Sequence, residues 1–254
     1  MFFLVGIGLK PEHLTLEAQN ALKECSEIYL EQYTSQYSEG SFEFLEALLA
    51  RKVQFTDRHE VETAFKQRLE EAKSNNLALL VFGNPLTATT HVQLLLDCKK
   101  MKIPFKVVPG VSITNFIAQT GLQEYKFGRT MTIVLPEKNY SPESFYELIK
   151  ENQKLGLHSL CLLDIKQEHK KLMSIKEALE VLEKIEEKHK DSVIKKAVLV
   201  GIAGAGSSKM QVKAGSAKQL KQFGFHEFPQ SLIVCGTLSE KEKEALKALA
   251  GLKE

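Results

Sequence analysis

Short apolar runs alternate with amphipathic helical segments along the first half of this chain, and this alternation constrains the fold more than any other feature. The runs that predict strands lie at 2–8, 27–33, 52–57, 77–83 and 104–110. The segments between them carry apolar residues at helical spacing. Strands that alternate with helices of this length are joined by crossovers into a parallel sheet. The first half therefore predicts an α/β domain with a mostly parallel sheet.

The second half has a different rhythm. Strands are predicted at 130–136, 157–165, 195–206 and 231–239, with a returning antiparallel strand at 209–216. Long helices are predicted at 141–156, 174–191 and 240–251. This order favours a mixed sheet. Gly121 and Gly128 interrupt the pattern between the halves, so we expect two α/β domains, at 1–126 and 127–254.

Polar residues before several helices predict their starts. Thr15 and Ser112 precede helical patterns, and the threonines of the segment 87–90 are candidate caps of a helix expected at 89–102. Ser141 is followed by Pro142, which suits the first position of a helix. Their side-chain oxygens would accept hydrogen bonds from the first free amides of each helix.

Charge and cysteine content exclude some classes of function. The formal net charge is only +2, whereas nucleic-acid-binding domains usually carry a strong basic excess. The four cysteines form no C-x-x-C pair and lie in or beside apolar runs, which predicts structural thiols and a cytoplasmic protein. We find no signal peptide and no run of the ~20 apolar residues that a membrane span needs. The seven histidines, at 13, 59, 91, 158, 169, 189 and 226, lack metal-ligand spacing; for His91 we expect a place in the core or at a helix cap.

Two glycine-rich turns resemble nucleotide-binding motifs only in part. Gly6 and Gly8 fit the start of a dinucleotide fingerprint, and Glu31 stands where a ribose-binding acid would stand, but Pro11 occupies the third glycine position. In the turn at 201–209, Lys209 comes too late for a phosphate-binding loop. That turn either joins two strands or lets the backbone approach a ligand closely.

The ends of the predicted strands hold the remaining signal. Small or polar turns follow four strands, at Gly8-Leu9, at 83–85, at 109–112 and at Asp164. Ligands of open α/β sheets bind outside the carboxyl ends of the strands. The chain has no nucleophile elbow and no converging acid–base set. Group transfer from an activated donor, which requires little beyond positioning, is therefore favoured.

Five segments in order, FFLVGIGL, FGNPLTATTH, VVPGVSI, TGLQEYKFG and LHSLCLLDIK, resemble the diphthine synthases. These form a family within the tetrapyrrole-methylase superfamily of S-adenosylmethionine-dependent methyltransferases. The resemblance runs through nearly the whole chain. It implies a homodimer of two-domain chains with the cofactor in the cleft between the domains. It also implies repeated methylation of the amino group on a modified histidine of translation elongation factor 2, in diphthamide biosynthesis, with S-adenosylhomocysteine as product.

Matched position by position, the resemblance implies eight cofactor-binding residues: Leu9, Asn84, Thr87, Ser112, Ile113, Leu163, Ala205 and Gln230. The chain departs from the family at three positions. Asn84 replaces an aspartate, Gly204 an arginine and Gln230 a histidine. No residue is identified as the base that takes the proton from the amine, although Asp164 and Tyr125 are candidates.

Other interpretations remain open. One is a methylase that acts on carbon atoms of a corrin or porphyrin ring, another is a nicotinamide-dependent oxidoreductase, and a third is a binding module without catalysis. No nucleic acid, membrane or metal is expected as a partner. A protein substrate would need a docking surface. Six lysines of the C-terminal half are candidates for it: Lys195, Lys196, Lys209, Lys213, Lys218 and Lys221. A solvated face is the simpler interpretation of these lysines.

Overall fold

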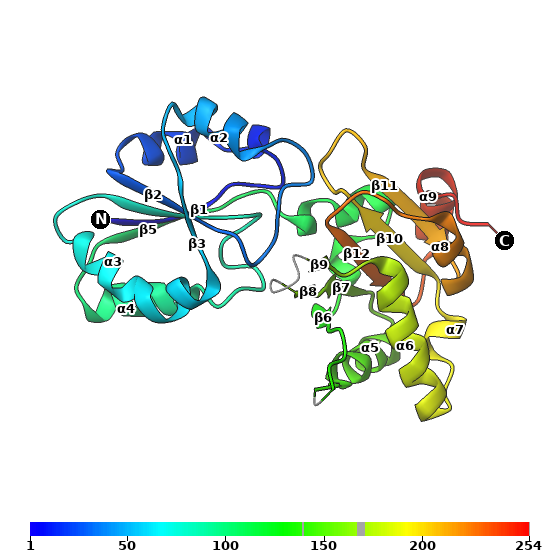
Figure 1. Cartoon of the computed structure of the whole chain (residues 1–254). Helices are drawn as coiled ribbons and strands as arrows, with labels where there is room; N and C mark the ends of the chain where they lie inside the picture. Colours follow the sequence, from blue (N-terminus) through cyan, green and yellow to red (C-terminus); the bar gives the residue numbers. More distant parts are fainter. Residues whose placement is uncertain (139, 167–170, 254) are drawn as a thin grey trace. The chain divides into compact units, whose positions relative to one another are not determined.

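The computed structural model describes residues 1–138, 140–166 and 171–253, so His169 lies outside the described residues. The chain forms two compact units, Met1–Asn115 and Phe116–Glu254 (Figure 1). The predicted boundary after residue 126 lies later than this division. The segment that precedes it is bonded into the second unit, since the Gln123 amide donates to Glu242 Oε1 at 3.1 Å and Lys126 Nζ donates to the Thr237 carbonyl at 2.7 Å.

The first unit contains a five-stranded sheet in the order β3-β2-β4-β1-β5, and all its pairings are parallel, as predicted. Helices cover both faces of this sheet, with α1 and α2 on one side and α3 and α4 on the other (Figure 1). The strands are β1 (Phe2–Gly6), β2 (Glu27–Glu31), β3 (Gln54–Thr56), β4 (Leu77–Val81) and β5 (Phe105–Val108); the helices are α1 (Leu16–Lys23), α2 (Phe42–Leu49), α3 (Phe65–Glu71) and α4 (Val92–Lys100).

The central strand β1 shows why the first sheet is covered on both faces. Its side chains alternate between two apolar cores. Phe3 and Val5 belong to the core that also contains Leu22 of α1, whereas Phe2 and Leu4 belong to a second core. Because every residue of β1 is buried, its sequence is a continuous apolar run, as expected for a parallel sheet between two helix layers.

The second unit contains the predicted mixed sheet, in the order β11-β10-β12-β7-β6. Only β6 and β7 pair in parallel, and the other neighbours are antiparallel. A small hairpin of β8 and β9 stands apart. The strands are β6 (Met131–Ile133), β7 (Ser159–Leu163), β8 (Ile165–Lys166), β9 (Lys171–Leu172), β10 (Leu199–Ala203), β11 (Gln211–Gly215) and β12 (Gln230–Val234).

Five α-helices accompany this sheet within the described residues: α5 (Ser144–Lys154), α6 (Ile175–His189), α7 (Val193–Lys196), α8 (Ala217–Phe223) and α9 (Glu240–Ala250). The core beneath them includes Tyr146 of α5, Leu182 of α6 and Leu232 of β12. The short α7 is absent from the sequence prediction. The buried Glu186 side chain supports it by accepting hydrogen bonds from the Ile194 and Lys195 amides at 2.6 and 3.1 Å.

The predicted helix start at Thr15 is correct, since Thr15 Oγ1 accepts a bond from the Ala18 amide at 3.0 Å. In α2, Ser41 Oγ caps the helix by accepting a bond from the Phe44 amide at 3.3 Å. The predicted start at Ser141 and Pro142 is wrong. Helix α5 begins at Ser144, and its N-cap residue Glu143 makes no side-chain cap bond.

The segment after Ser112 also differs from the prediction. It forms two short 3-10 helices, Ile113–Asn115 and Ile117–Thr120, in place of one α-helix. The Thr120 hydroxyl donates to the Ile117 carbonyl at 2.6 Å, and Gly121 follows with a φ of 93°. Such side-chain bonds to nearby backbone favour tight turns over a continuous helix.

The part of the chain that the structure describes contains neither a candidate metal cluster nor a candidate membrane-spanning helix. Within it, no group of three or more His, Cys, Asp or Glu side chains could hold a metal ion. No helix in the same ranges is long and apolar enough to cross a membrane. All four cysteines are free and buried.

Candidate functional site

The carboxyl ends of three neighbouring strands of the first unit meet without side chains between them. They carry Gly6, Gly83 and Gly110, from β1 and from the turns after β4 and β5. A Cβ atom on Gly110 would lie 2.2 Å from the Gly83 carbonyl oxygen, and one on Gly6 would lie 2.6 Å from the Gly110 nitrogen. Only glycine permits this contact. The three strand ends therefore pack backbone against backbone, with no side chain between them.

Leu9, Asn84 and Ser112 leave this edge from the three glycine turns. Gly8 and Gly83 form an antiparallel bridge, with the Gly83 amide donating to the Gly8 carbonyl at 2.9 Å. A Cβ on Gly83 would lie 3.5 Å from Ser112 Cβ and 3.9 Å from Leu9 Cδ2. The structure therefore brings these predicted site residues together at one sheet edge.

The turn from Asn84 to Thr87 keeps two polar groups available. Asn84 Oδ1 accepts a bond from the Leu86 amide at 3.2 Å, and the Asn84 carbonyl accepts one from the Thr87 amide at 3.2 Å. Thr87 is exposed and Asn84 half-buried. Among the described residues, neither the Asn84 Nδ2 group nor the Thr87 hydroxyl has a hydrogen-bond partner.

The predicted threonine caps of α4 are wrong. The helix begins at Val92, and its N-cap residue His91 makes no side-chain cap bond. The Thr89 hydroxyl donates instead to the Pro85 carbonyl at 2.7 Å, and the Thr90 hydroxyl to Glu62 at 3.4 Å. The threonines therefore brace the turn itself.

Ser112 and Ile113 follow β5. Ser112 is buried, its amide donates to Asn115 Oδ1 at 2.9 Å, and its hydroxyl lies 2.7 Å from the Thr114 hydroxyl. Ile113 is half-buried at the start of the first 3-10 helix. The Ser112 hydroxyl thus turns to a neighbouring hydroxyl and makes no backbone cap.

The predicted site residues of the second unit also share one sheet edge. Leu163 ends β7, Gln230 begins β12, and Ala205 lies just beyond the end of β10. Gln230 pairs with Ala203, and its neighbour Ser231 pairs with Leu162. This register places the carboxyl ends of β7 and β10 on either side of the start of β12.

The polar side chains at this second edge are engaged with backbone. Gln230 Oε1 accepts a bond from the Ile175 amide at 2.7 Å, and its Nε2 donates to the Phe225 and Glu227 carbonyls at 3.4 and 3.0 Å. The Asp164 carboxylate accepts bonds from the Leu135 amide at 3.0 Å and the Ile165 amide at 2.9 Å. Both side chains hold this edge together.

The turn after β10 explains one departure from the family pattern. Gly204 has a φ of 61°, and a Cβ there would lie 2.8 Å from Glu227 Cβ. This backbone conformation favours glycine over any residue with a side chain. The turn joins β10 to the antiparallel β11, as one of the two interpretations of the segment 201–209 predicted.

The other sequence candidates lie elsewhere. Tyr125 is 79% exposed in a 3-10 turn. Of the six lysines, Lys221 pairs with Glu183 at 2.7 Å and Lys213 donates to the Gly251 carbonyl at 2.8 Å. These two bonds fit the simpler interpretation of a solvated face.

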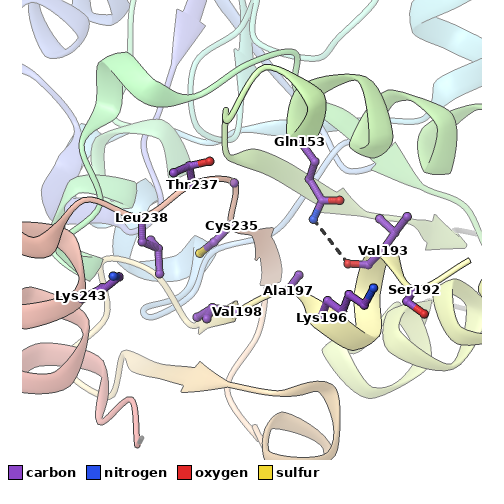
Figure 2. A pocket seen from close by; sticks show the side chains of 11 residues that line it. Gln153, Ser192, Val193, Lys196, Ala197, Val198, Cys235, Thr237, Leu238 and Lys243 are labelled. Atoms are coloured by element: carbon purple, nitrogen blue, oxygen red, sulfur yellow. Dashed lines mark hydrogen bonds between the residues drawn. The ribbon is translucent and has the colours of Figure 1, made fainter.

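A cavity of about 560 Å³ lies at the opposite edge of the second sheet, beside the end of β12 and the start of β10 (Figure 2). Lys196, Lys243 and the Cys235 thiol are among the side chains that line it. Burial raises the pKa of Cys235 to about 12, so the thiol is not a nucleophile at neutral pH. The cavity does not include any of the predicted site residues.

Sequence reasoning missed one contact in the first unit. His91 is buried and lies between the Pro85 carbonyl and the Tyr33 hydroxyl, each 3.1 Å from a ring nitrogen. A place in the core was expected for His91, but no local signal indicates Tyr33 as its partner.

The edge of the first unit carries polar groups on Asn84 and Thr87 that are free among the described residues and can hydrogen-bond a polar ligand. A nicotinamide dinucleotide fits poorly. The buried Glu31 carboxylate already accepts bonds from the Tyr33 and Thr34 amides, both at 3.0 Å, so it is not available to a ribose.

Comparisons with known proteins show the family to which the chain belongs. The model of the tetrapyrrole (corrin/porphyrin) methylases matches residues 1–221. The chain is 40% identical to a diphthine synthase of Methanocaldococcus jannaschii over 255 residues, and 38% identical to one of Methanococcus aeolicus over 251, each match covering 98% of both chains. A crystal structure of a diphthine synthase superposes with a TM-score of 0.89 at 29% identity, covering 100% of this chain and 97% of the other. The chain therefore belongs to the tetrapyrrole methylase family and, within it, groups with the diphthine synthases.

Proposed function

We propose that this chain is an S-adenosylmethionine-dependent methyltransferase that repeatedly methylates the amino group of the modified histidine of elongation factor 2, in diphthamide biosynthesis. The observation that carries the proposal is the bare backbone edge formed by Gly6, Gly83 and Gly110, from which Leu9, Asn84 and Ser112 emerge. The similarity to diphthine synthases over 98% of the chain supplies the substrate.

S-Adenosylmethionine, when bound, supplies a methyl group activated by its sulfonium. The residues of this chain would bind the cofactor and the substrate, orient them and exclude water. These are the main requirements of such a displacement. Asn84, Thr87 and Ser112 would hydrogen-bond the polar parts of the cofactor. Leu9, Ile113, Leu163 and Ala205 would contact its apolar parts. We propose that Gln230 contributes through its backbone, because its side chain is engaged elsewhere.

Each methylation requires a neutral amine, so a proton must leave the substrate before each transfer. Asp164 is disfavoured as the base because both carboxylate oxygens accept backbone amides. Tyr125 is the other candidate base, and its side chain is 79% exposed.

The decisive experiment mixes the protein with labelled S-adenosylmethionine and elongation factor 2 that carries the aminocarboxypropyl-histidine. We expect transfer of label to the factor, and mass spectrometry to show one or more added methyl groups. Factor that lacks the modification should remain unlabelled. Absence of transfer, or label on the unmodified factor, would contradict the proposal.

The corrin or porphyrin methylase is the second candidate, because the matching family model covers that class. Absorption spectra with an added tetrapyrrole would reveal binding, which we do not expect. We further propose a cytoplasmic homodimer. The four free cysteines suit a reducing compartment, and light scattering of the purified chain would measure its oligomeric state.

A further inference from the structure

His91 is enclosed between the candidate cofactor turn and the loop that follows β2. Its side chain is 1% exposed. The ring nitrogens lie 3.1 Å from the Pro85 carbonyl oxygen (Nδ1) and 3.1 Å from the Tyr33 hydroxyl (Nε2). A carbonyl oxygen only accepts, so Nδ1 carries the proton and Nε2 accepts from Tyr33. Burial lowers the pKa of His91, which favours this neutral form.

The Pro85 carbonyl is the point at which the turn is fastened. It accepts bonds from His91 Nδ1 and from the Thr89 hydroxyl, at 3.1 and 2.7 Å. Between Pro85 and Thr89, Ala88 has a φ of 56°, which is uncommon for a residue with a side chain. Because the segment 84–90 belongs to no helix or strand, its conformation depends on such bonds.

Residues of neighbouring loops pack around the His91 ring. The Tyr33 ring packs edge-on against the His91 ring at 6.0 Å and carries the Arg58 guanidinium 5.5 Å from its centre. Arg58 pairs with Glu62 at 3.3 Å, and Glu62 also accepts a bond from the Thr90 hydroxyl. The loops after β2, β3 and β4 are thus tied together around this ring.

We propose that His91 is a positioning residue for the cofactor. Its Nδ1–H bond to Pro85 holds the turn in the conformation that presents Asn84 and Thr87 at the glycine edge. The inference rests on the proposed function, because it assumes that these two residues contact S-adenosylmethionine.

Two substitutions separate the two bonds of the ring. In His91→Asn the side-chain amide occupies the place of Nδ1 and retains the bond to Pro85. In His91→Gln the amide reaches the place of Nε2, so the bond to Tyr33 is retained and that to Pro85 is lost. Tyr33→Phe removes the second bond alone. Ile28→Ala is a control for general destabilisation, because Ile28 lies in a core of the same unit.

Calorimetry with S-adenosylmethionine and S-adenosylhomocysteine would compare the four variants with the unmodified protein. We expect His91→Gln to raise the Kd of both ligands roughly 10-fold, the effect of one lost buried hydrogen bond. His91→Asn, Tyr33→Phe and Ile28→Ala should stay within about 3-fold of the original Kd. In turnover assays His91→Gln should raise the KM for cofactor and leave kcat nearly unchanged.

Equal Kd values for His91→Asn and His91→Gln would overturn the positioning role, as would lowered unfolding temperatures with an unchanged Kd in both. If the unmodified protein binds neither ligand, the proposed function itself fails, and the positioning role fails with it. A normal Kd in the unmodified protein with no difference among the variants refutes only the inference about His91.

Discussion

Each unit has a sheet edge that carries turns of the candidate site, and the two edges are built in different ways. In the first unit the edge is made of glycine backbone, and the polar groups of Asn84 and Thr87 remain available. In the second unit the polar side chains of Gln230 and Asp164 are bonded to backbone. The difference follows from topology. Parallel strands all end at one edge, whereas in a mixed sheet strands begin and end there side by side, and side chains tie the resulting loops together.

The comparison shows that a position at a strand end does not by itself indicate whether a polar side chain is left free for a ligand or is bonded within the protein. Asn84 follows a predicted strand and Gln230 precedes one, and both are expected to bind the cofactor, yet of the two only the Asn84 side chain has a polar group without a partner among the described residues. Substitutions should therefore affect backbone packing in the first unit and buried polar bonds in the second.

The largest effect is expected for Gly110→Ala. The new Cβ would lie 2.2 Å from the Gly83 carbonyl oxygen and 2.7 Å from the Gly6 carbonyl carbon, which forces backbone apart at the cost of about 3 kcal/mol of unfolding free energy. Urea titration followed by circular dichroism would measure the loss. Cofactor binding should weaken as well, because the edge itself is displaced.

Gly224→Ala is the matched control for this substitution. Gly224 has a φ of 69°, and nothing lies within 4 Å of its Cβ position, so only backbone strain of about 1 kcal/mol is expected. Equal losses in the two variants would contradict the role of close backbone contact at the first edge.

The next largest effect that we expect is a loss of stability of the second unit in acid. Glu242 is 1% exposed and accepts bonds from Lys126, from the Ser239 and Gln123 amides and from His158 Nε2. Burial opposes ionisation, but these donors together lower the pKa of Glu242 from 4.5 to about 2. A lowered pKa contributes stability above pH 4.5 that is lost as the pH falls toward 2.

The pKa of Glu31 in the first unit is shifted in the opposite direction. Burial raises its pKa above the ordinary value of 4.5, so acid removes no stability through this group. Hydrogen exchange read by mass spectrometry between pH 5 and pH 3 should show residues 116–253 opening before residues 1–115.

Glu242→Gln tests the cause of this difference. The substitution should cost about 2 kcal/mol at pH 7, the value of hydrogen bonds to a buried charge, and should reduce the acid sensitivity of the second unit. If the first unit opens first in the unmodified protein, or if the variant keeps the full acid sensitivity, this account of Glu242 is wrong.

A smaller effect on stability is expected for Gln230→Ala, at about 1.5 kcal/mol, because the Ile175 amide loses its acceptor and two carbonyls lose their donor. The Kd for S-adenosylmethionine should change little. Asn84→Ala is the reciprocal variant, with little loss of stability and a Kd raised roughly 10-fold. A reversed result, with the larger Kd change at Gln230, would mean that the second edge also binds through its side chains.

Local patterns along the chain predict the two α/β units, the parallel and mixed sheets and the strand ends that carry the candidate site. These features follow from burial periodicity and turn residues, which are local properties of the chain. The resemblance in five segments located the same turns and named the family.

Tertiary structure alone decided the partners of the polar side chains. His91 meets Tyr33 across 58 residues and Gln230 meets the Ile175 amide across 55, distances over which no local pattern carries information. The same limit explains the wrong helix caps at 87–90 and the 3-10 turns after Ser112. In each case a hydroxyl had several acceptors or donors within reach, and packing of the folded chain selected among them.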